Sequence, residues 1–153
     1  MSSRRELIRM TDGEVDTFLA GRHTMAVATL MPDGRPHVVA MWYGFLDGQP
    51  AFWTYTKSQK VRNLERDPRI TCLVEAGDSY DRLRGVELSG TGEVLPGEDS
   101  VMAIGRSVNE RYSGPVTDAT EDVIRQMGRK RVAVRIHVDR VVSWDHGKLG
   151  GTY

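Results

Sequence analysis

The sequence has a single cysteine, no net charge and no long apolar run in its 153 residues. Because Cys72 stands alone, no disulfide can form within the chain, and such sparing use of cysteine is typical of a reducing compartment. Lys plus Arg total 21 and Asp plus Glu total 21, so the overall charge gives no reason to expect capture of nucleic acid or of an anionic membrane. Any basic binding site must therefore be local.

No segment approaches the roughly 20 apolar residues of a membrane span, and the N-terminus lacks the apolar run of a signal peptide. We therefore expect a cytoplasmic protein. The sequence has neither internal repeats nor low-complexity segments, and its length matches that of one domain. A single domain over 1–153 is predicted.

Familiar catalytic motifs are missing as well. The histidines His23, His37, His137 and His146 lack a metal-ligand spacing, and no Ser/His/Asp arrangement or carboxylate pair is apparent. The glycines form neither a GxGxxG fingerprint nor a phosphate-binding P-loop. The sequence therefore predicts neither a metal site nor hydrolysis, and it assigns no catalytic residue.

What the sequence has is a succession of strand patterns separated by turns. Asp-Gly pairs at 33–34 and 47–48 are strong hairpin signals. Gly90 and Gly92 indicate curvature or a close backbone approach within a long strand. Alternation of apolar and polar residues predicts six strands, over 24–31, 36–46, 50–56, 70–75, 86–94 and 131–144.

Helix signals lie between these strands. Thr11 with Glu14 forms a capping-box pattern, Ser58 is placed to cap a short helix, and Asp118 with Glu121 is expected to cap the last helix. A flat sheet of six strands in so short a chain would leave exposed edges, which closure into a barrel removes. The expected fold is mainly β with peripheral α-helices, a six-stranded antiparallel barrel.

A local basic site is indicated directly after the third predicted strand. The stretch TKSQKVR places Lys57, Lys60 and Arg62 within one turn of a helix start, where free N–H groups also favour an anion. This combination predicts a phosphate site. The alternative is a solvated basic face balanced by Glu65 and Asp67, and the local sequence leaves it open.

The second predicted strand, GRPHVVAMWYGFL, is unusually apolar. Burial of both of its faces would explain the composition by packing alone. Alternatively, backbone groups of the segment 36–40 contact the polar edge of a flat ring that lies on the barrel wall. Both interpretations remain open at this point.

These stretches resemble the pyridoxamine 5′-phosphate oxidase-like, FMN-binding split-barrel superfamily, from Thr11 to Trp144. Within it, TYTKSQKVRNLERDPRITCLVE and the tail SWDHGKLGGTY are similar to the branch that uses the deazaflavin coenzyme F420 in actinobacteria. The resemblance implies a split β-barrel and a homodimer with two cofactor sites at the subunit interface, each built from both chains. The ending GKLGGTY departs from that of the true oxidase, which disfavours vitamin B6 oxidation.

The resemblance also implies three groups of cofactor-binding residues. The deazaflavin ring would be flanked by Pro36, His37, Val38, Val39 and Ala40. The ribityl phosphate would be held by Thr56, Lys57, Lys60, Val61, Arg62 and Asn63. A third group, from either chain of the dimer, would comprise Asp78, Ser79 and Trp144.

The implied function is that of an F420-dependent oxidoreductase. Reduced F420 would transfer hydride to an electron-poor double bond of a small organic substrate, such as an enone, a quinone or biliverdin. The protein would supply positioning and water exclusion, with Tyr43, Tyr55, Tyr80 and His37 as conceivable proton donors. The alternatives are an FMN-binding oxidoreductase or flavin reductase, and a non-catalytic carrier of F420 or haem.

Overall fold

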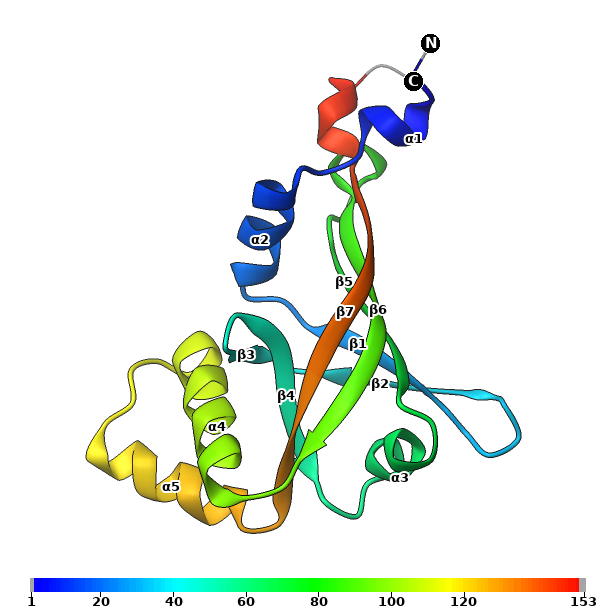
Figure 1. Ribbon diagram of the computed structural model, residues 1–153. Helices are drawn as coiled ribbons and strands as arrows, with labels where there is room; N and C mark the ends of the chain where they lie inside the picture. The colour runs from blue at the N-terminus through cyan, green and yellow to red at the C-terminus, as the bar shows by residue number, and fades with distance from the viewer. Residues whose placement is uncertain (1, 152–153) are drawn as a thin grey trace.

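One curled antiparallel sheet dominates the computed structural model, which describes residues 2–151 (Figure 1). The strands run in the order β2-β1-β5-β6-β7-β4-β3 across the sheet. Their bounds are β1 Met25–Leu30, β2 Pro36–Met41, β3 Gly44–Leu46, β4 Gln49–Tyr55, β5 Arg69–Ala76, β6 Arg84–Leu95 and β7 Arg131–Asp145. The prediction of a mainly β, antiparallel fold is confirmed.

The predicted strand 36–46 is broken at Trp42 and Tyr43, so the sheet has seven strands and the prediction of six is wrong. The Tyr43 side chain is fully buried, and its hydroxyl donates a hydrogen bond to the Leu19 carbonyl at 2.6 Å. Within the described residues, β2 pairs with β1 and β3 pairs with β4, but β2 and β3 do not pair with each other. The sheet therefore forms a half-barrel that is not closed by hydrogen bonds.

Glycines shape this sheet where the sequence indicated. Gly34 and Gly48 take φ angles of 84° and 76° in the two hairpin turns. The long β6–β7 pairing shifts register between Ser89 and Gly90, which marks a β-bulge. A Cβ atom on Gly90 would lie 1.9 Å from the His137 carbonyl oxygen, so only glycine fits there. The predicted close backbone approach is thus confirmed.

Five α-helices and two short 3₁₀ turns complete the described residues. The capping box of Thr11 and Glu14 is confirmed at the second helix. The predicted cap of the last helix is wrong: Thr117, not Asp118, is its N-cap, because the Thr117 hydroxyl accepts a hydrogen bond from the Thr120 N–H. The bounds are α1 Arg4–Leu7, α2 Asp12–Ala20, α3 Gln59–Arg66, α4 Glu98–Tyr112, α5 Asp118–Gly128, η1 Tyr80–Arg82 and η2 His146–Leu149.

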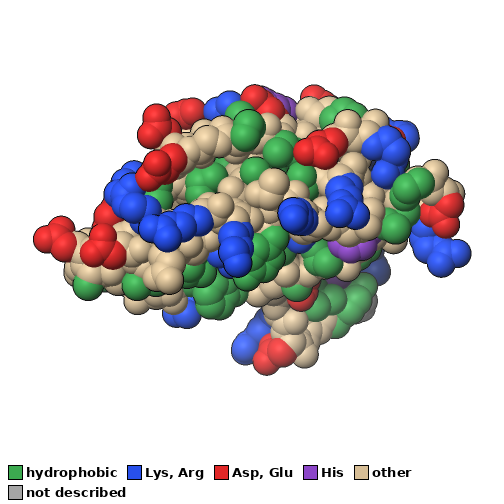
Figure 2. Space-filling model, turned by 90° about the horizontal axis from the view of Figure 1, so that it is seen from below, with side chains coloured by type: hydrophobic (Ala, Val, Ile, Leu, Met, Phe, Trp, Pro, Cys, Tyr) green, Lys and Arg blue, Asp and Glu red, His purple; other side chains and the backbone are tan. Residues whose placement is uncertain are grey.

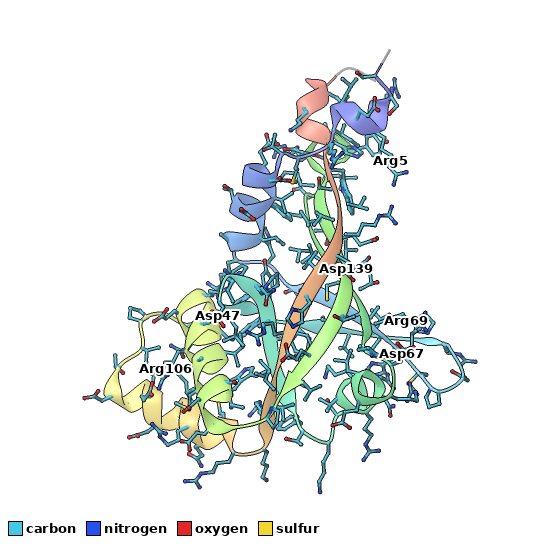
Figure 3. All side chains as sticks on the ribbon, in the orientation of Figure 1. Arg5, Asp47, Asp67, Arg69, Arg106 and Asp139 are labelled. Atoms are coloured by element: carbon cyan, nitrogen blue, oxygen red, sulfur yellow. The ribbon has the colours of Figure 1, made fainter. Side chains whose placement is uncertain are left out.

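The molecule has a broad base and a narrow extension (Figure 1). At the base, α4 and α5 lie on one side of the sheet and α3 on the other, while β5, β6 and β7 continue upward to η1, η2 and α1. Figure 3 marks the two ends by Arg5 above and by Asp67, Arg69 and Arg106 below. No helix within residues 2–151 combines the length and apolar character needed to cross a membrane.

Arg111 of α4 fastens helix α2 to the break between β2 and β3. Its guanidinium donates hydrogen bonds to the carbonyls of Leu19, Ala20 and Gly21 at the end of α2, at 3.2, 3.1 and 2.9 Å. It also donates to the Tyr43 carbonyl at 2.8 Å and lies 4.6 Å from the centre of the Tyr43 ring. One side chain thus donates to four carbonyls, and for those of Ala20 and Tyr43 it is the donor outside regular secondary structure within the described residues.

We expect Arg111→Met to lower the free energy of unfolding by about 2 to 3 kcal/mol, because the Ala20 and Tyr43 carbonyls lose their side-chain donor and two further hydrogen bonds are lost. Arg106→Met is the matched control. Arg106 lies on the same helix but pairs with Glu121 at the surface, so its loss should cost less than about 1 kcal/mol. Urea denaturation measures both values, and equal values would contradict the assigned role of Arg111.

Candidate functional site

Two turns meet at the base of the half-barrel and frame the candidate site. One turn joins β4 to α3, and the other joins α5 to β7 (Figure 1). The Thr56 N–H and hydroxyl both donate to the Lys130 carbonyl, at 2.9 and 3.2 Å. The two turns are therefore held side by side.

Lys60, in the first turn of α3, is the most informative residue of the site. Its side chain is buried, with 9% of the residue exposed, and the ammonium donates to the Thr54 hydroxyl at 2.9 Å. It forms no ion pair with any described residue, and burial lowers its pKa. Because a buried charge without a counter-ion is unfavourable, this environment suits a bound anion.

Other cations come from the same two turns and from the start of α3. They form no ion pair within residues 2–151. Figure 2 views this end of the molecule and shows a row of Lys and Arg side chains beside hydrophobic ones. We call these cations the basic rim: Lys57, Arg62, Arg129, Lys130 and Arg131.

The acidic residues that could have balanced this rim are engaged elsewhere or unpaired. Asp67 pairs with Arg69 at 2.6 Å, and this hydrogen-bonded pair lowers the pKa of Asp67 to about 2. Glu65 forms no ion pair with the described residues. Neither of these two carboxylates therefore balances the basic rim through an ion pair.

The N-terminus of α3 differs from the expectation that Ser58 caps it. Ser58 occupies the N-cap position, but its side chain makes no hydrogen bond to the first turn. Its hydroxyl instead accepts a hydrogen bond from the Thr54 hydroxyl at 3.5 Å. The capping expectation is thus wrong in its chemistry, and the first-turn N–H groups receive no side-chain cap.

Two of the predicted phosphate-binding residues lie on the buried side of α3. Val61 and Asn63 are both buried, at 1% and 0% exposure. The Asn63 amide donates to the Thr29 hydroxyl at 3.0 Å and accepts from the Gln59 amide at 2.9 Å. The hydrogen bond to Thr29 fastens α3 to β1, so Asn63 positions the helix, and neither of the two buried side chains is part of the exposed basic rim.

Strand β2 presents an apolar face at the edge of the sheet. Pro36, Val38 and Ala40 are exposed, and Val38 is 60% exposed. His37 and Val39 point to the other face and are half-buried; the Nδ1 atom of His37 is buried without a hydrogen-bond partner in the described chain. The interpretation that both faces of this strand are buried is therefore wrong.

A hollow of about 440 Å³ lies between this strand and the basic rim. Trp53, Thr54 and Arg131 were not among the predicted site residues. Arg131 is far from Tyr55 in the sequence, and only the β4–β7 register shows that the two stand opposite each other. The walls include Ala40, Trp42, Trp53, Tyr55, Lys60 and Arg131.

The third predicted group lies at the other end of the chain. Asp78 and Ser79 precede η1, and Trp144 pairs with Gly85 near the top of the extension. Trp144 is thirteen positions along β7 from Arg131, which corresponds to up to about 40 Å of strand. Within one chain, the structure does not bring these residues together with Lys60.

The chemistry available at the base is therefore anion binding beside an apolar wall. A sequence profile described as pyridoxamine 5′-phosphate oxidase matches residues 11–145. The chain therefore belongs to the pyridoxamine 5′-phosphate oxidase family of split barrels, a family that includes oxidoreductases. The resemblance inferred from the sequence is confirmed.

Three solved structures illustrate the range of similar proteins. A conserved hypothetical protein from Mycobacterium tuberculosis is 45% identical, with a TM-score of 0.93 over 99% of this chain and 95% of the other. An F420 reductase is 30% identical, with a TM-score of 0.63 over 82% and 94%. A haem storage protein from Vibrio cholerae is 15% identical, with a TM-score of 0.67 over 86% and 94%, and shares the fold.

We expect Lys60→Met to raise the free energy of unfolding by about 0.5 to 1 kcal/mol, because an apolar side chain replaces a buried, uncompensated charge. The same variant should lose stabilisation by added inorganic phosphate, measured as the shift in melting temperature. Lys57→Met at the exposed rim is the control and should change the unfolding free energy by less than about 0.5 kcal/mol. Destabilisation of the Lys60 variant by more than about 1 kcal/mol would give Lys60 a structural role.

Proposed function

We propose that this protein binds coenzyme F420 and acts as an F420-dependent oxidoreductase. The observation that carries the proposal is Lys60, a buried ammonium without a counter-ion beside an exposed apolar strand. A cofactor that joins a flat ring to a phosphate arm matches both features. The 30% identity to an F420 reductase supports the same assignment.

The residues at the base fit the parts of such a cofactor. Lys60, Lys57, Arg62 and the first-turn N–H groups of α3 would hold the phosphate. The exposed face and free edge of β2, over 36–40, would lie against the ring. When bound, reduced F420 supplies hydride to an electron-poor double bond, while the protein orients the reactants and excludes water.

The number of cations favours F420 over FMN. FMN ends at its phosphate, whereas the arm of F420 continues into a lactyl and glutamyl tail whose units add carboxylates. Lys60, Lys57, Arg62 and the α3 terminus are enough for one phosphate, yet the basic rim adds Arg129 and Lys130. Unpaired cations beyond the phosphate site match a longer anionic ligand.

The structure distinguishes the candidate proton donors by their position relative to the site. The hydroxyl of Tyr43 is bonded to the Leu19 carbonyl, and burial raises the pKa of Tyr43 to about 12, which removes it. Tyr80 starts η1 at the far end of the same chain. Tyr55 remains beside the site, at the end of β4, whereas the His37 side chain points to the opposite face of β2.

A homodimer would complete the site. The edge strand β2 exposes backbone hydrogen-bonding groups and apolar side chains, which is a surface that proteins normally cover. Asp78, Ser79 and Trp144 cannot reach the base of their own chain along the extension, so their participation requires a second chain.

The cofactor assignment is tested by titration with F420 and with FMN, read by fluorescence and by thermal shift. F420 should bind the more tightly. The variant with both Lys57→Ala and Arg62→Ala should lose about 2 to 4 kcal/mol of binding free energy, whereas the control Arg69→Ala should lose none. Tighter binding of FMN would replace F420 by FMN in the proposal.

Turnover distinguishes the enzyme from a carrier. Oxidation of reduced F420 is followed with a panel of enones, quinones, nitro compounds and biliverdin. At least one of these acceptors should accelerate oxidation when the protein is present. Tight binding of F420 or haem without any turnover would favour the carrier.

The dimer is tested by charging its predicted interface. Val38→Glu should shift the protein toward monomer in sedimentation velocity, because a carboxylate would be buried in an apolar contact. Val123→Glu is the matched control, since Val123 is similarly exposed at 55% but lies on α5. A wild-type protein that is monomeric at micromolar concentration would exclude the shared site.

A further inference from the structure

The hollow at the base has aromatic walls that contribute no group to the proposed phosphate site. It lies between the end of β2, the end of β4, helix α4 and the start of β7, and Lys60 of α3 also lines it. Its volume of about 440 Å³ is within the range of small-ligand sites. Trp42, Trp53 and Tyr55 contribute rings to its lining, while Val108 of α4 adds an aliphatic side chain.

The Trp42 ring is held in place at one side of this hollow by stacking. Its ring stacks on the Tyr112 ring with a centroid distance of 4.7 Å and an interplanar angle of 2°. The Tyr112 hydroxyl is itself bonded, donating to the His23 carbonyl at 2.5 Å and accepting from the Tyr43 N–H at 3.3 Å. Trp42 is nevertheless 52% exposed, so a planar ligand can stack on it without a rearrangement of the wall.

Arg131 supplies a fixed cation at the other side. Its guanidinium carbon lies 5.0 Å from the centre of the Trp53 ring and 4.4 Å from that of Tyr55. One of its nitrogens donates to the Met127 carbonyl at 2.6 Å. Arg131 forms no ion pair anywhere in residues 2–151, so its charge remains available to a ligand.

We infer that this hollow binds a planar, conjugated organic anion, with its ring system against Trp42 and its carboxylate or sulfonate on Arg131. That this anion is the substrate of the enzyme rests on the proposed function. That the hollow binds such an anion rests only on its aromatic walls and on the unpaired guanidinium. Stacking on Trp42 favours a planar ligand, and Arg131, which lies against Trp53 and Tyr55, places the negative charge beside the aromatic walls, while the Lys60 ammonium is bonded to the Thr54 hydroxyl.

The test uses the three tryptophans of the chain as reporters. Trp42 and Trp53 line the hollow, and Trp144 at the other end of the molecule is the internal reference. The indole N–H signals in a ¹H–¹⁵N spectrum, assigned with Trp42→Phe and Trp53→Phe, are followed during titration without cofactor. The probes are 2-naphthoate, its neutral analogue 2-naphthamide, and the aliphatic dianion glutarate.

The expected result is that 2-naphthoate shifts the signals of Trp42 and Trp53 and leaves that of Trp144 unchanged. The amide and glutarate should bind at least about tenfold more weakly. Arg131→Gln should remove the preference for the anion, whereas the control Arg69→Gln, at an exposed arginine outside the hollow, should retain it. Glutarate binding as tight as naphthoate would instead make the hollow part of an acidic-tail site and overturn the inference.

Equal binding of naphthoate and naphthamide, or equal effects of the two arginine variants, would also overturn the inference. Because the titration contains no cofactor, its outcome is independent of the F420 assignment. If F420 does not bind but naphthoate behaves as expected, the proposed function fails and the aromatic anion site stands. If F420 binds and naphthoate does not, the aromatic anion site fails and the proposed function stands.

Discussion

The buried position of Tyr43 is the constraint on which the rest of the architecture depends. Its hydroxyl, amide and carbonyl are all engaged, by Leu19, Tyr112 and Arg111 respectively. A tyrosine held in this way cannot continue the alternation of an ordinary strand, so β2 ends before it and β3 begins after it. The two halves then join opposite ends of the sheet, which curls the sheet and leaves β2 at an open edge.

The open edge in turn makes a binding site possible. A closed barrel would pair the backbone of β2 on both sides, so its edge groups would not be available to a ligand. The same break brings Trp42 against Tyr112 of α4, which forms one side of the hollow. Lys60 then supplies the charge at the foot of this wall, at a cost to stability that a purely structural residue would not carry.

Local signals in the sequence were enough to predict most of the elements. The hairpin turns, the capping box of α2 and the need for glycine at position 90 each depend on neighbouring residues or on backbone geometry that a short motif specifies. The cluster of Lys57, Lys60 and Arg62 could be predicted because the three residues are close together in the sequence. These predictions needed no knowledge of distant contacts.

The remaining features depend on contacts between distant segments. The break at Tyr43 needs Leu19 and Arg111, which are far from it in the sequence, so a continuous strand was the natural expectation from apolar composition alone. Arg131 joined the site only through its pairing with Tyr55 across β4 and β7. Burial also separated Lys60, which faces the site, from Asn63, which supports the helix from behind.

The bulge in the β6–β7 pairing has a consequence for the far end of the molecule. Ser89 is opposite Arg140 and Gly90 is opposite Val138, so Asp139, labelled in Figure 3, is one residue too many for the ladder. Below it the even-numbered side chains of β7 share the face of the core strands, and above it the parity is reversed. Trp144 is thereby turned to the outside of the extension. A chain without this one aspartate would keep the pairs on both sides and lose the local bend and twist of the bulge, so its C-terminal arm would leave the base at a different angle.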